Sequence, residues 1–306
     1  MDSMIAARHL AKHYGATVAV DDLSFDVTPG VVTGFLGPNG SGKSTTMRMI
    51  MGLDTPTSGS ALVNGVPYRR LRWPLREVGA LLDAKAFHPG RSARNHLLFL
   101  AQTNGIAAGR VDEVLDIVGL TAVAHDRAGR YSRGMGQRLG IAAALLGDPP
   151  VLLFDEPVNG LDPEGIRWIR HLLRDLAAEG RTVFVSSHLI NEMALTAERL
   201  VVIGRGTVIA ETSVSEFTAR STTKAVRVVT PTSRTFVSAL IGAGAEVTVE
   251  DDGAIVVRGM SSAEVGELAT DRSLTVHELV PLRASLEDAF MELTRDSVEY
   301  RTREAS

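Results

Sequence analysis

The sequence contains no cysteine among its 306 residues. This absence excludes a disulfide framework, a cysteine-ligated zinc site, an iron–sulfur cluster and a cysteine nucleophile. The chain also lacks any apolar run near the roughly 18 residues needed to cross a bilayer, since its longest apolar stretch covers only residues 139–146. No apolar block follows the charged N-terminal residues, so a signal peptide is not expected. We therefore expect a cytoplasmic protein.

Neither sign of charge dominates the chain. Its formal net charge is −4, which does not indicate a basic nucleic-acid binder. The charge is unevenly distributed, because residues 1–225 hold 24 basic and 22 acidic side chains (24 − 22 = +2), whereas residues 226–306 hold 8 and 14 (8 − 14 = −6). Together with the polar segment at residues 221–223, this shift predicts two domains, 1–220 and 225–306.

Short apolar, β-branched segments alternate with helical patterns through the first domain. The predicted strands are residues 5–10, 18–27, 31–36, 151–154 and 182–186, with a hairpin formed by 201–203 and 207–211. The predicted helices are residues 44–51, 92–120, 135–147 and 164–178. This alternation favours an α/β core with a largely parallel sheet.

The tail has a different pattern. Strands are predicted at residues 226–229, 246–250 and 254–258, and helices at 236–242, 263–270 and 286–293. The Asp251-Asp252-Gly253 segment between the last two strands is a hairpin turn signal. The tail is therefore expected to be a small α+β domain.

A glycine-rich segment lies between the apolar run at 31–36 and the helical pattern that follows. It fits the pattern G-x-x-x-x-G-K-[ST] and consists of Gly37, Pro38, Asn39, Gly40, Ser41, Gly42, Lys43, Ser44 and Thr45. Glycines let backbone N–H groups turn toward phosphate oxygens, and the helix N-terminus adds partial positive charge. Lys43 can then reach the β- and γ-phosphates, and the Ser44 hydroxyl can ligate Mg²⁺. An ordinary glycine turn is the alternative, but the flanking strand and helix favour a phosphate loop.

An acidic pair ends the apolar strand at residues 151–154. Asp155 lies at the carboxyl end of that strand, where α/β sheets bind ligands. Asp155 would belong to the Mg²⁺ shell, and Glu156 can polarise an attacking water. An apolar run ending in Asp-Glu is by itself often only a strand leaving the core. In combination with the phosphate loop, it predicts nucleotide hydrolysis.

These motifs, with four further landmarks in a fixed order, resemble the nucleotide-binding subunits of ABC transporters. Residues 131–138, Y-S-R-G-M-G-Q-R, are similar to the family signature L-S-G-G-Q, and residues 159–163, N-G-L-D-P, are similar to the D-loop. His188 resembles the switch histidine that follows a strand. Tyr14 resembles the aromatic residue that stacks on adenine. The resemblance covers about residues 4–220.

The resemblance implies a P-loop NTPase cassette: a mostly parallel sheet, an antiparallel β subdomain and a helical subdomain at about residues 84–148. It implies ATP and Mg²⁺ as cofactors and a homodimer that encloses two Mg·ATP. Glu156 and His188 would be catalytic, and Asp155 and Ser44 would ligate the metal. The residues with implied nucleotide contacts, beyond the phosphate loop, are Tyr14, Ser132, Gly134, Met135 and Asp162.

Three positions depart from the family pattern. Arg133 stands where the signature usually has its first glycine, and Met135 where it has glutamine. Asp83 aligns with a glutamine that the family carries between the phosphate loop and the signature. As a ligand through water, Asp83 would help to hold Mg²⁺. As a bare charge beside the phosphates, it would oppose closure of the dimer.

The resemblance further implies an exporter ATPase, peripheral on the inner face of the cell membrane, that drives a separate polytopic permease and binds no nucleic acid. Residues 285–290, S-L-E-D-A-F, are similar to the end of accessory domains on drug and antibiotic exporters. The alternative is a non-transport ABC ATPase acting on DNA or the ribosome. Such proteins usually carry two cassettes or a long coiled-coil insertion, and this chain has neither pattern. A P-loop phosphotransferase would have no reason to keep the ordered landmarks.

Overall fold

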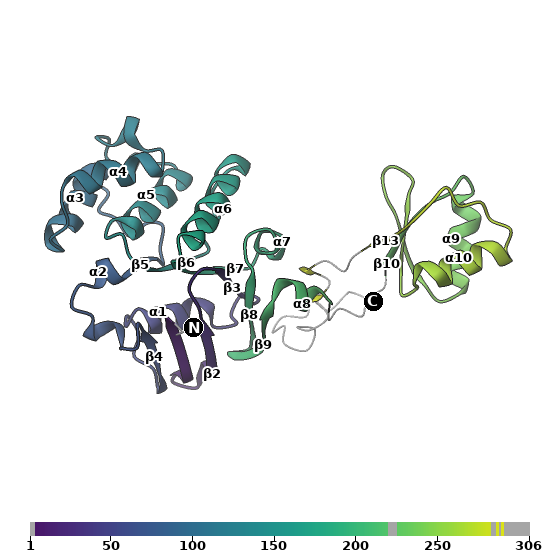
Figure 1. The fold of residues 1–306 in the computed structure, drawn as a ribbon, viewed down its shortest axis with the longest axis horizontal. Coiled ribbons are helices and arrows are strands. Elements are labelled where there is room, and N and C mark those ends of the chain that lie inside the picture. The colour runs from purple at the N-terminus through teal and green to yellow at the C-terminus, as the bar shows by residue number, and fades with distance from the viewer. Residues whose placement is uncertain (1–3, 220–224, 283–285, 288, 291–306) are drawn as a thin grey trace. The chain divides into compact units, whose positions relative to one another are not determined.

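The computed structural model describes residues 4–219, 225–282, 286–287 and 289–290 (Figure 1). The chain folds into two compact units, with the division between Ser213 and Val214. The division falls a few residues before position 220, where the sequence placed the end of the first domain. Helix α8 (Val214–Ala219) therefore belongs to the second unit. The polar segment at residues 221–223 lies outside the described residues.

A six-stranded sheet forms the centre of the first unit, with the order β5-β6-β7-β3-β8-β9. Five of its strands are parallel, and β9 runs antiparallel to β8. Strands β3 and β7 are buried along their whole length, as expected for continuous apolar runs in a sheet covered on both faces. The predicted α/β core with a largely parallel sheet is confirmed. The strands are β3 (Val32–Leu36), β5 (Val78–Leu81), β6 (Val151–Asp155), β7 (Thr182–Ser187), β8 (Arg199–Gly204) and β9 (Thr207–Ser213).

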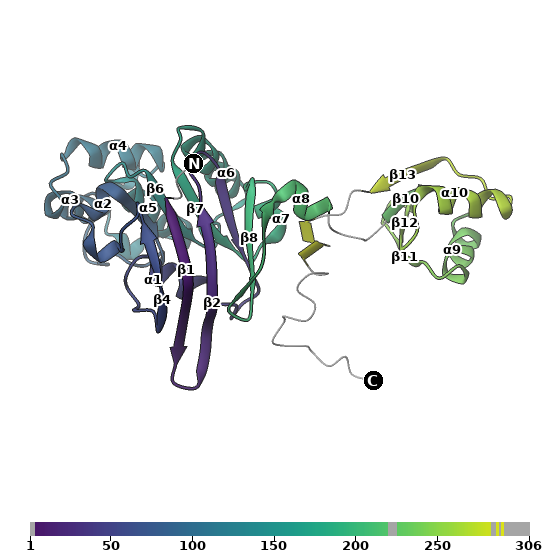
Figure 2. The same ribbon diagram turned by 60° about the horizontal axis from the view of Figure 1, so that its bottom comes forward.

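A separate antiparallel sheet with the order β2-β1-β4 lies beside this core. Figure 2 shows its two long strands, β1 (Ile5–Tyr14) and β2 (Thr17–Val27), running side by side. The third strand, β4 (Ser58–Val63), was absent from the sequence prediction, as was β5 of the main sheet. Helix α1 (Lys43–Ile50) contacts β1, β2 and β4 as well as β6. The phosphate-loop helix is therefore held between the two sheets.

Helices α3 (Ala93–Thr103), α4 (Gly109–Ile117) and α5 (Arg133–Leu145) form the helical part of the first unit (Figure 1). The single helix predicted over residues 92–120 is wrong, because the chain breaks at Gly105, which has φ +63°. Helix α5 packs directly on β5. A Cβ on Gly79 of that strand would collide with the carbonyl oxygen of Ala144, so glycine permits this close approach.

Other helices connect the strands or cover them. Helix α6 (Pro163–Ala178) contacts β7 and β3. Short helices are α2 (Pro74–Glu77), α7 (Ile190–Ala194), η1 (Tyr68–Arg70), η2 (Thr121–Val123) and η3 (Ala128–Arg130). Among the described residues, no helix is both long enough and apolar enough to pass through a bilayer.

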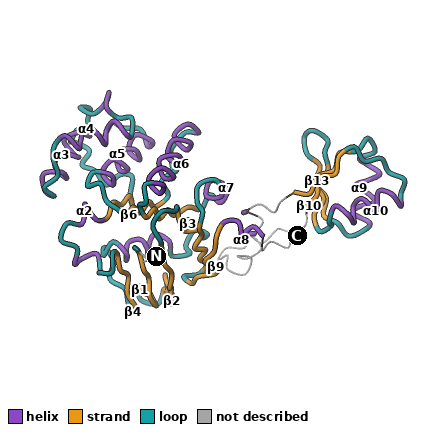
Figure 3. Tube along the Cα trace, viewed as in Figure 1, coloured by secondary structure: helices purple, strands orange, loops and turns teal. Residues whose placement is uncertain are grey.

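The second unit contains an antiparallel sheet with the order β11-β12-β10-β13, together with α9 (Ser233–Gly242) and α10 (Ser262–Asp271) (Figure 3). Its core includes Val226, Phe236 and Ile255. The predicted small α+β domain is confirmed, although its fourth strand was not predicted. The helix expected at residues 286–293 lies largely outside the described residues. The strands are β10 (Ala225–Val229), β11 (Glu246–Val249), β12 (Ile255–Arg258) and β13 (Glu278–Leu282).

Three phenylalanine rings join the two sheets of the first unit. Phe25 of β2 lies 5.5 Å from Phe35 of β3 and 5.6 Å from Phe184 of β7, measured between ring centroids. Phe35 and Phe184 are 5.1 Å apart. All three side chains are buried. Because the phosphate loop follows β3, this cluster fixes the platform from which the loop projects.

Replacing one of the three rings tests this role. Phe184→Ala should lower the free energy of unfolding of the first unit by about 3–5 kcal/mol, because it removes a buried ring and leaves a cavity. Phe99→Ala, at a side chain that is 45% exposed, should cost less than about 1 kcal/mol. Urea unfolding followed by tryptophan fluorescence measures both, since the two tryptophans, Trp73 and Trp168, lie in the first unit. Equal losses in the two variants would contradict the prediction.

Candidate functional site

The glycine-rich segment forms a tight loop between β3 and α1. Gly40 and Gly42 have φ values of +81° and +102°, in the left-handed region that favours glycine. A Cβ on Gly42 would lie 2.5 Å from the carbonyl oxygen of Ala19, so the loop packs closely on β2. Backbone N–H groups at the start of α1 are therefore available to an anion.

The Lys43 side chain is buried inside this loop, with 7% of its surface exposed. Its Nζ donates to the carbonyl oxygens of Gly37, at 2.6 Å, and Pro38, at 3.1 Å. Burial lowers the pKa of the Lys43 ammonium, and the nearby carboxylates of Glu156 and Asp155 act in the opposite direction. A phosphate group would give this desolvated cation a full negative charge as its partner.

A cavity of about 640 Å³ opens over the loop. Besides the loop, three groups of residues border it: the start of β2, the segment after β6 and the residue after β7. Its lining outside the loop consists of Thr17, Val18, Ala19, Glu156, Asn159 and His188. The structure therefore brings both predicted catalytic residues, Glu156 and His188, to the phosphate loop.

Asp155 and Ser186 meet where two neighbouring strands end. The parallel register pairs Asp155 of β6 with Ser186 of β7. The Ser186 hydroxyl donates to Oδ1 of Asp155 and accepts from the backbone N–H of Glu156 at 3.0 Å. One buried serine thus orients two consecutive acidic residues.

Glu156 and His188 form a close pair at the edge of the cavity. Nδ1 of His188 lies 2.7 Å from Oε2 of Glu156, within hydrogen-bond distance. The Glu156 side chain is 18% exposed and that of His188 is 39% exposed. Glu156 also has φ +51°, a conformation that non-glycine residues seldom adopt. A strained, partly buried carboxylate beside a phosphate loop suits general-base chemistry.

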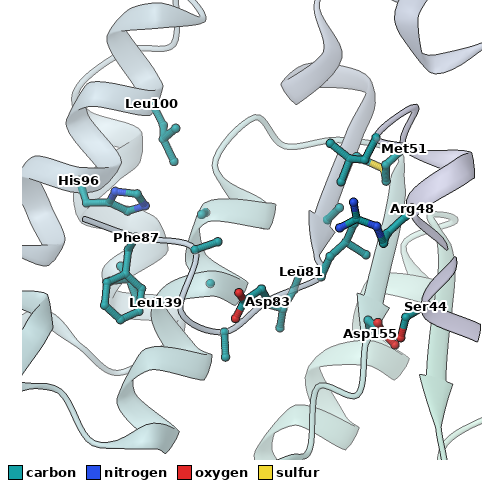
Figure 4. Close-up of a pocket in the computed structure, with 17 residues that line it drawn as sticks. Ser44, Arg48, Met51, Leu81, Asp83, Phe87, His96, Leu100, Leu139 and Asp155 are labelled. Atoms are coloured by element: carbon teal, nitrogen blue, oxygen red, sulfur yellow. The ribbon is translucent and has the colours of Figure 1, made fainter. Parts of the chain in front are cut away.

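The three predicted metal ligands line a second cavity, of about 630 Å³. Figure 4 shows Ser44 and Asp155 with their oxygens facing each other, and Asp83 farther along the same cavity on the loop after β5. Oδ1 of Asp83 accepts from the backbone N–H of Lys85 at 2.8 Å. Hydroxyl and carboxylate oxygens are the hard donors that Mg²⁺ prefers.

Protein side chains alone would not complete a metal shell here. Across the described ranges, no group of three or more histidine, aspartate or glutamate residues has the geometry to hold a metal ion. Mg²⁺ usually takes one or two protein ligands and completes its shell with phosphate and water oxygens. Ser44 and Asp155 fit that requirement.

The signature residues do not line the cavity over the phosphate loop of their own chain. The Ser132 hydroxyl accepts from the backbone N–H of Met135 at 3.2 Å and so caps α5. Ser132 lines a third cavity, of about 640 Å³, together with Arg133 and Gly160. Gly134 packs beside Gly160, since a Cβ on it would lie 3.1 Å from the Gly160 carbonyl oxygen.

Two further residues with predicted nucleotide contacts, Asp162 and Tyr14, do not line the loop cavity. Asp162 caps α6, accepting from the backbone N–H of Gly165 at 2.8 Å. Tyr14, at the end of β1, is 50% exposed. Its hydroxyl donates to Oδ2 of Asp54 at 3.1 Å, and Nζ of Lys12 lies 4.9 Å from its ring centroid. An exposed ring held in this way can accept a flat base on its free face.

Sequence reasoning missed several residues of the site. The backbone carbonyl of Ala19 packs against Gly42 of the phosphate loop, and the Ser186 hydroxyl donates to Asp155. Both groups reach the site only in the folded protein, so neither has a local sequence signal. Asp54 meets Tyr14 from 40 positions away. Gln137 belongs to the signature segment, but its hydrogen bond to the Glu156 carbonyl oxygen has no local sequence signal.

A phosphate loop after a central parallel strand, with an aspartate at the end of a strand two positions away in the same sheet, defines a P-loop nucleotide-binding protein. The family model described as ABC transporter matches residues 20–159. A second model, described as a domain of unknown function (DUF8746), matches residues 224–287.

The chain is 34% identical over 312 residues to the uncharacterized ABC transporter ATP-binding protein YhcH of Bacillus subtilis (strain 168), with 98% of each chain covered. It is 41% identical over 214 residues to the bacitracin transport ATP-binding protein BcrA of Bacillus licheniformis, covering 69% of this chain and 70% of that protein. The dimeric ATP-binding cassette MJ0796 in a post-hydrolysis state, bound to ADP and Pi, matches with a TM-score of 0.64 and 27% identity. That match covers 69% of this chain and 99% of the other.

The chain therefore belongs to the ATP-binding proteins of ABC transporters, which are ATPases whose hydrolysis is coupled to transport. The predicted family and enzyme class are confirmed.

The role of Lys43 can be tested by nucleotide binding. Lys43→Ala should weaken ATP binding by about tenfold or more, because it removes the charge that would face the β- and γ-phosphates. Lys85→Ala, at an exposed lysine outside the loop, should leave the affinity unchanged. Isothermal titration calorimetry measures both variants. An unaltered affinity in Lys43→Ala would remove this residue from the phosphate site.

Proposed function

We propose that two copies of this chain enclose two ATP molecules, each bound between the phosphate loop of one copy and the signature segment of the other. The observation that carries the proposal is the separation of these two parts within one chain. The loop lines one cavity with Glu156 and His188, whereas Ser132 and Arg133 line another. A second copy would supply the missing half of each site.

Within each site, the residues of the loop cavity would divide the work. Lys43 and the loop N–H groups would hold the phosphates, and the exposed ring of Tyr14 would stack on adenine. Glu156 would orient the attacking water in line with the γ-phosphate and accept its proton. His188, 2.7 Å from Glu156, would hold that carboxylate and contact the γ-phosphate.

Ser44 and Asp155 would hold Mg²⁺. When bound, the ion neutralises charge on the β- and γ-phosphate oxygens. The Ser186 hydroxyl keeps Asp155 in place by donating to its Oδ1. On the opposite side of the nucleotide, the partner's signature helix would present Ser132 and the N–H groups of its first turn, including those of Gly134 and Met135, to the γ-phosphate. Asp162 would keep the D-loop ordered at the dimer interface by capping α6.

The free energy of ATP hydrolysis would drive a separate polytopic permease. This subunit would bind the permease on the inner face of the cell membrane. The cargo class we propose is a drug or antibiotic. Support comes from the bacitracin transport relative, which is 41% identical over 214 residues.

Co-purification from detergent-solubilised membranes tests the transport role. A polytopic membrane protein should elute with the tagged chain, and mass spectrometry should identify it. Recovery with ribosomes or DNA alone would overturn the exporter assignment in favour of a non-transport ATPase.

Glu156→Gln should keep ATP affinity and lower turnover by at least about 100-fold, because the amide cannot accept the proton of the attacking water. With hydrolysis blocked, ATP should also hold the two copies together as a dimer in size-exclusion chromatography. Steady-state ATPase assays measure turnover. A variant with the parent rate would exclude Glu156 as the base.

Asp83 offers a test of the metal site. Asp83 lines the cavity that contains Ser44 and Asp155, so we expect it to act on Mg²⁺ through water. Asp83→Asn should raise the Mg²⁺ concentration for half-maximal activity by about tenfold, as outer-shell substitutions do. Asp83→Gln, which restores the residue usual in the family, is the matched control for charge removal. Faster turnover at an unchanged Mg²⁺ requirement would instead show that the charge opposes closure.

A further inference from the structure

The backbone of Glu156 is held in an unusual conformation by its neighbours. Its φ of +51° lies in the left-handed region, which costs free energy for a residue with a Cβ. Such a conformation persists only where surrounding contacts enforce it. The direction of the carboxylate therefore depends on what holds the main chain at this residue.

Hydrogen bonds from three residues hold the Glu156 main chain within the described part of the protein. Its N–H donates to the Ser186 hydroxyl at 3.0 Å, and its carbonyl oxygen accepts from the N–H of Asn159 at 3.1 Å. The same carbonyl oxygen accepts from Nε2 of Gln137 at 3.3 Å. The first two partners lie on the neighbouring strand and in the same loop. Gln137 is different, because it lies in the second turn of α5.

Gln137 is only 2% exposed. Burying an amide is costly unless it is hydrogen-bonded, and an aliphatic side chain of similar size would fill the same space without that cost. An amide at this position is therefore explained by a hydrogen bond that its N–H group donates. The acceptor it has found is the main chain of the carboxylate-bearing residue.

The start of α5 also packs against the loop that follows Glu156. A Cβ on Gly160 would lie 3.3 Å from Cβ of Arg133 and closer still to the outer carbons of that side chain. A Cβ on Gly134 would lie 3.1 Å from the Gly160 carbonyl oxygen. A displacement of α5 would therefore press on this loop and pull on the bond from Gln137.

We propose that Gln137 is a positioning residue: its side-chain N–H fixes the main chain of Glu156 and so ties the direction of the catalytic carboxylate to helix α5. The inference rests on the proposed role of Glu156 as the base. It adds a link between the helix that Ser132 caps and the carboxylate that acts on the nucleotide in the same chain.

Gln137→Met removes the donor and keeps the length of the side chain. The expected result is a kcat about fivefold lower, the size of one hydrogen bond, with an unchanged KM for ATP because the phosphate loop is untouched. Ile141→Met, a fully buried residue of the same helix, is the control for a new methionine in α5. Its kcat should match the parent, and both variants should have the same Tm.

Gln137→Glu provides a readout that a packing role would not change. The protonated carboxyl can donate to the Glu156 carbonyl oxygen, whereas the ionised form cannot. Burial favours the protonated form, so the kcat of this variant relative to the parent should rise as the pH falls. The ratio for Gln137→Met should stay constant over the same pH range.

Combining substitutions distinguishes this inference from the proposed role of Glu156. In a Glu156→Gln background, Gln137→Met should not lower the residual turnover further, because it acts through the missing carboxylate. Parent-like kcat in both Gln137 variants would overturn the positioning role and leave the role of Glu156 intact. A kcat that falls only in step with Tm, without recovery of Gln137→Glu at low pH, would also overturn it. Parent-like turnover in Glu156→Gln alone would instead refute the assignment of the base.

Discussion

The register of three parallel strands is the constraint on which the site depends. Leu36 of β3 lies opposite Ser187 of β7, and Asp155 of β6 lies opposite Ser186. Each strand therefore ends at the same edge of the sheet. The phosphate loop, Glu156 and His188 follow directly from these ends, so backbone pairing alone brings them around one cavity. A shift of one residue would turn every side chain of a strand to the other face of the sheet.

Two polar side chains of the phosphate loop, Lys43 and Ser41, are buried. The Lys43 ammonium is desolvated and donates to two neutral carbonyl oxygens. The Ser41 hydroxyl is buried without a hydrogen-bond partner among the described residues. Phosphate oxygens offer both groups stronger acceptors, since charge-assisted hydrogen bonds exceed neutral ones. The hydrogen-bond donors of the loop are therefore complementary to the oxygens of a bound phosphate group.

The parts of the site that the sequence could predict are those formed by contiguous residues. The phosphate loop is predictable because a strand, a turn and a helix follow each other within one segment. The Asp155-Glu156 pair is predictable because it ends an apolar strand in a chain that also has this loop. Strand β5 has only four residues, and β4 is exposed over its first three. Neither strand was predicted, because neither has a sustained hydrophobic pattern. The helix predicted over residues 92–120 ignored Gly105, whose left-handed conformation ends one helix before the next begins. The contacts from Asp54 to Tyr14 and from Gln137 to Glu156 arise from tertiary packing, which local patterns do not encode.

The edge strand β9 marks the end of the unit that carries the site. It ends at Ser213, where the first compact unit gives way to the second, and among the described strands its pairing partner is β8 alone. Every residue of the candidate site precedes that point. Gene fusion, deletion or recombination downstream could therefore exchange the tail without breaking a strand pairing of the sheet that carries the site.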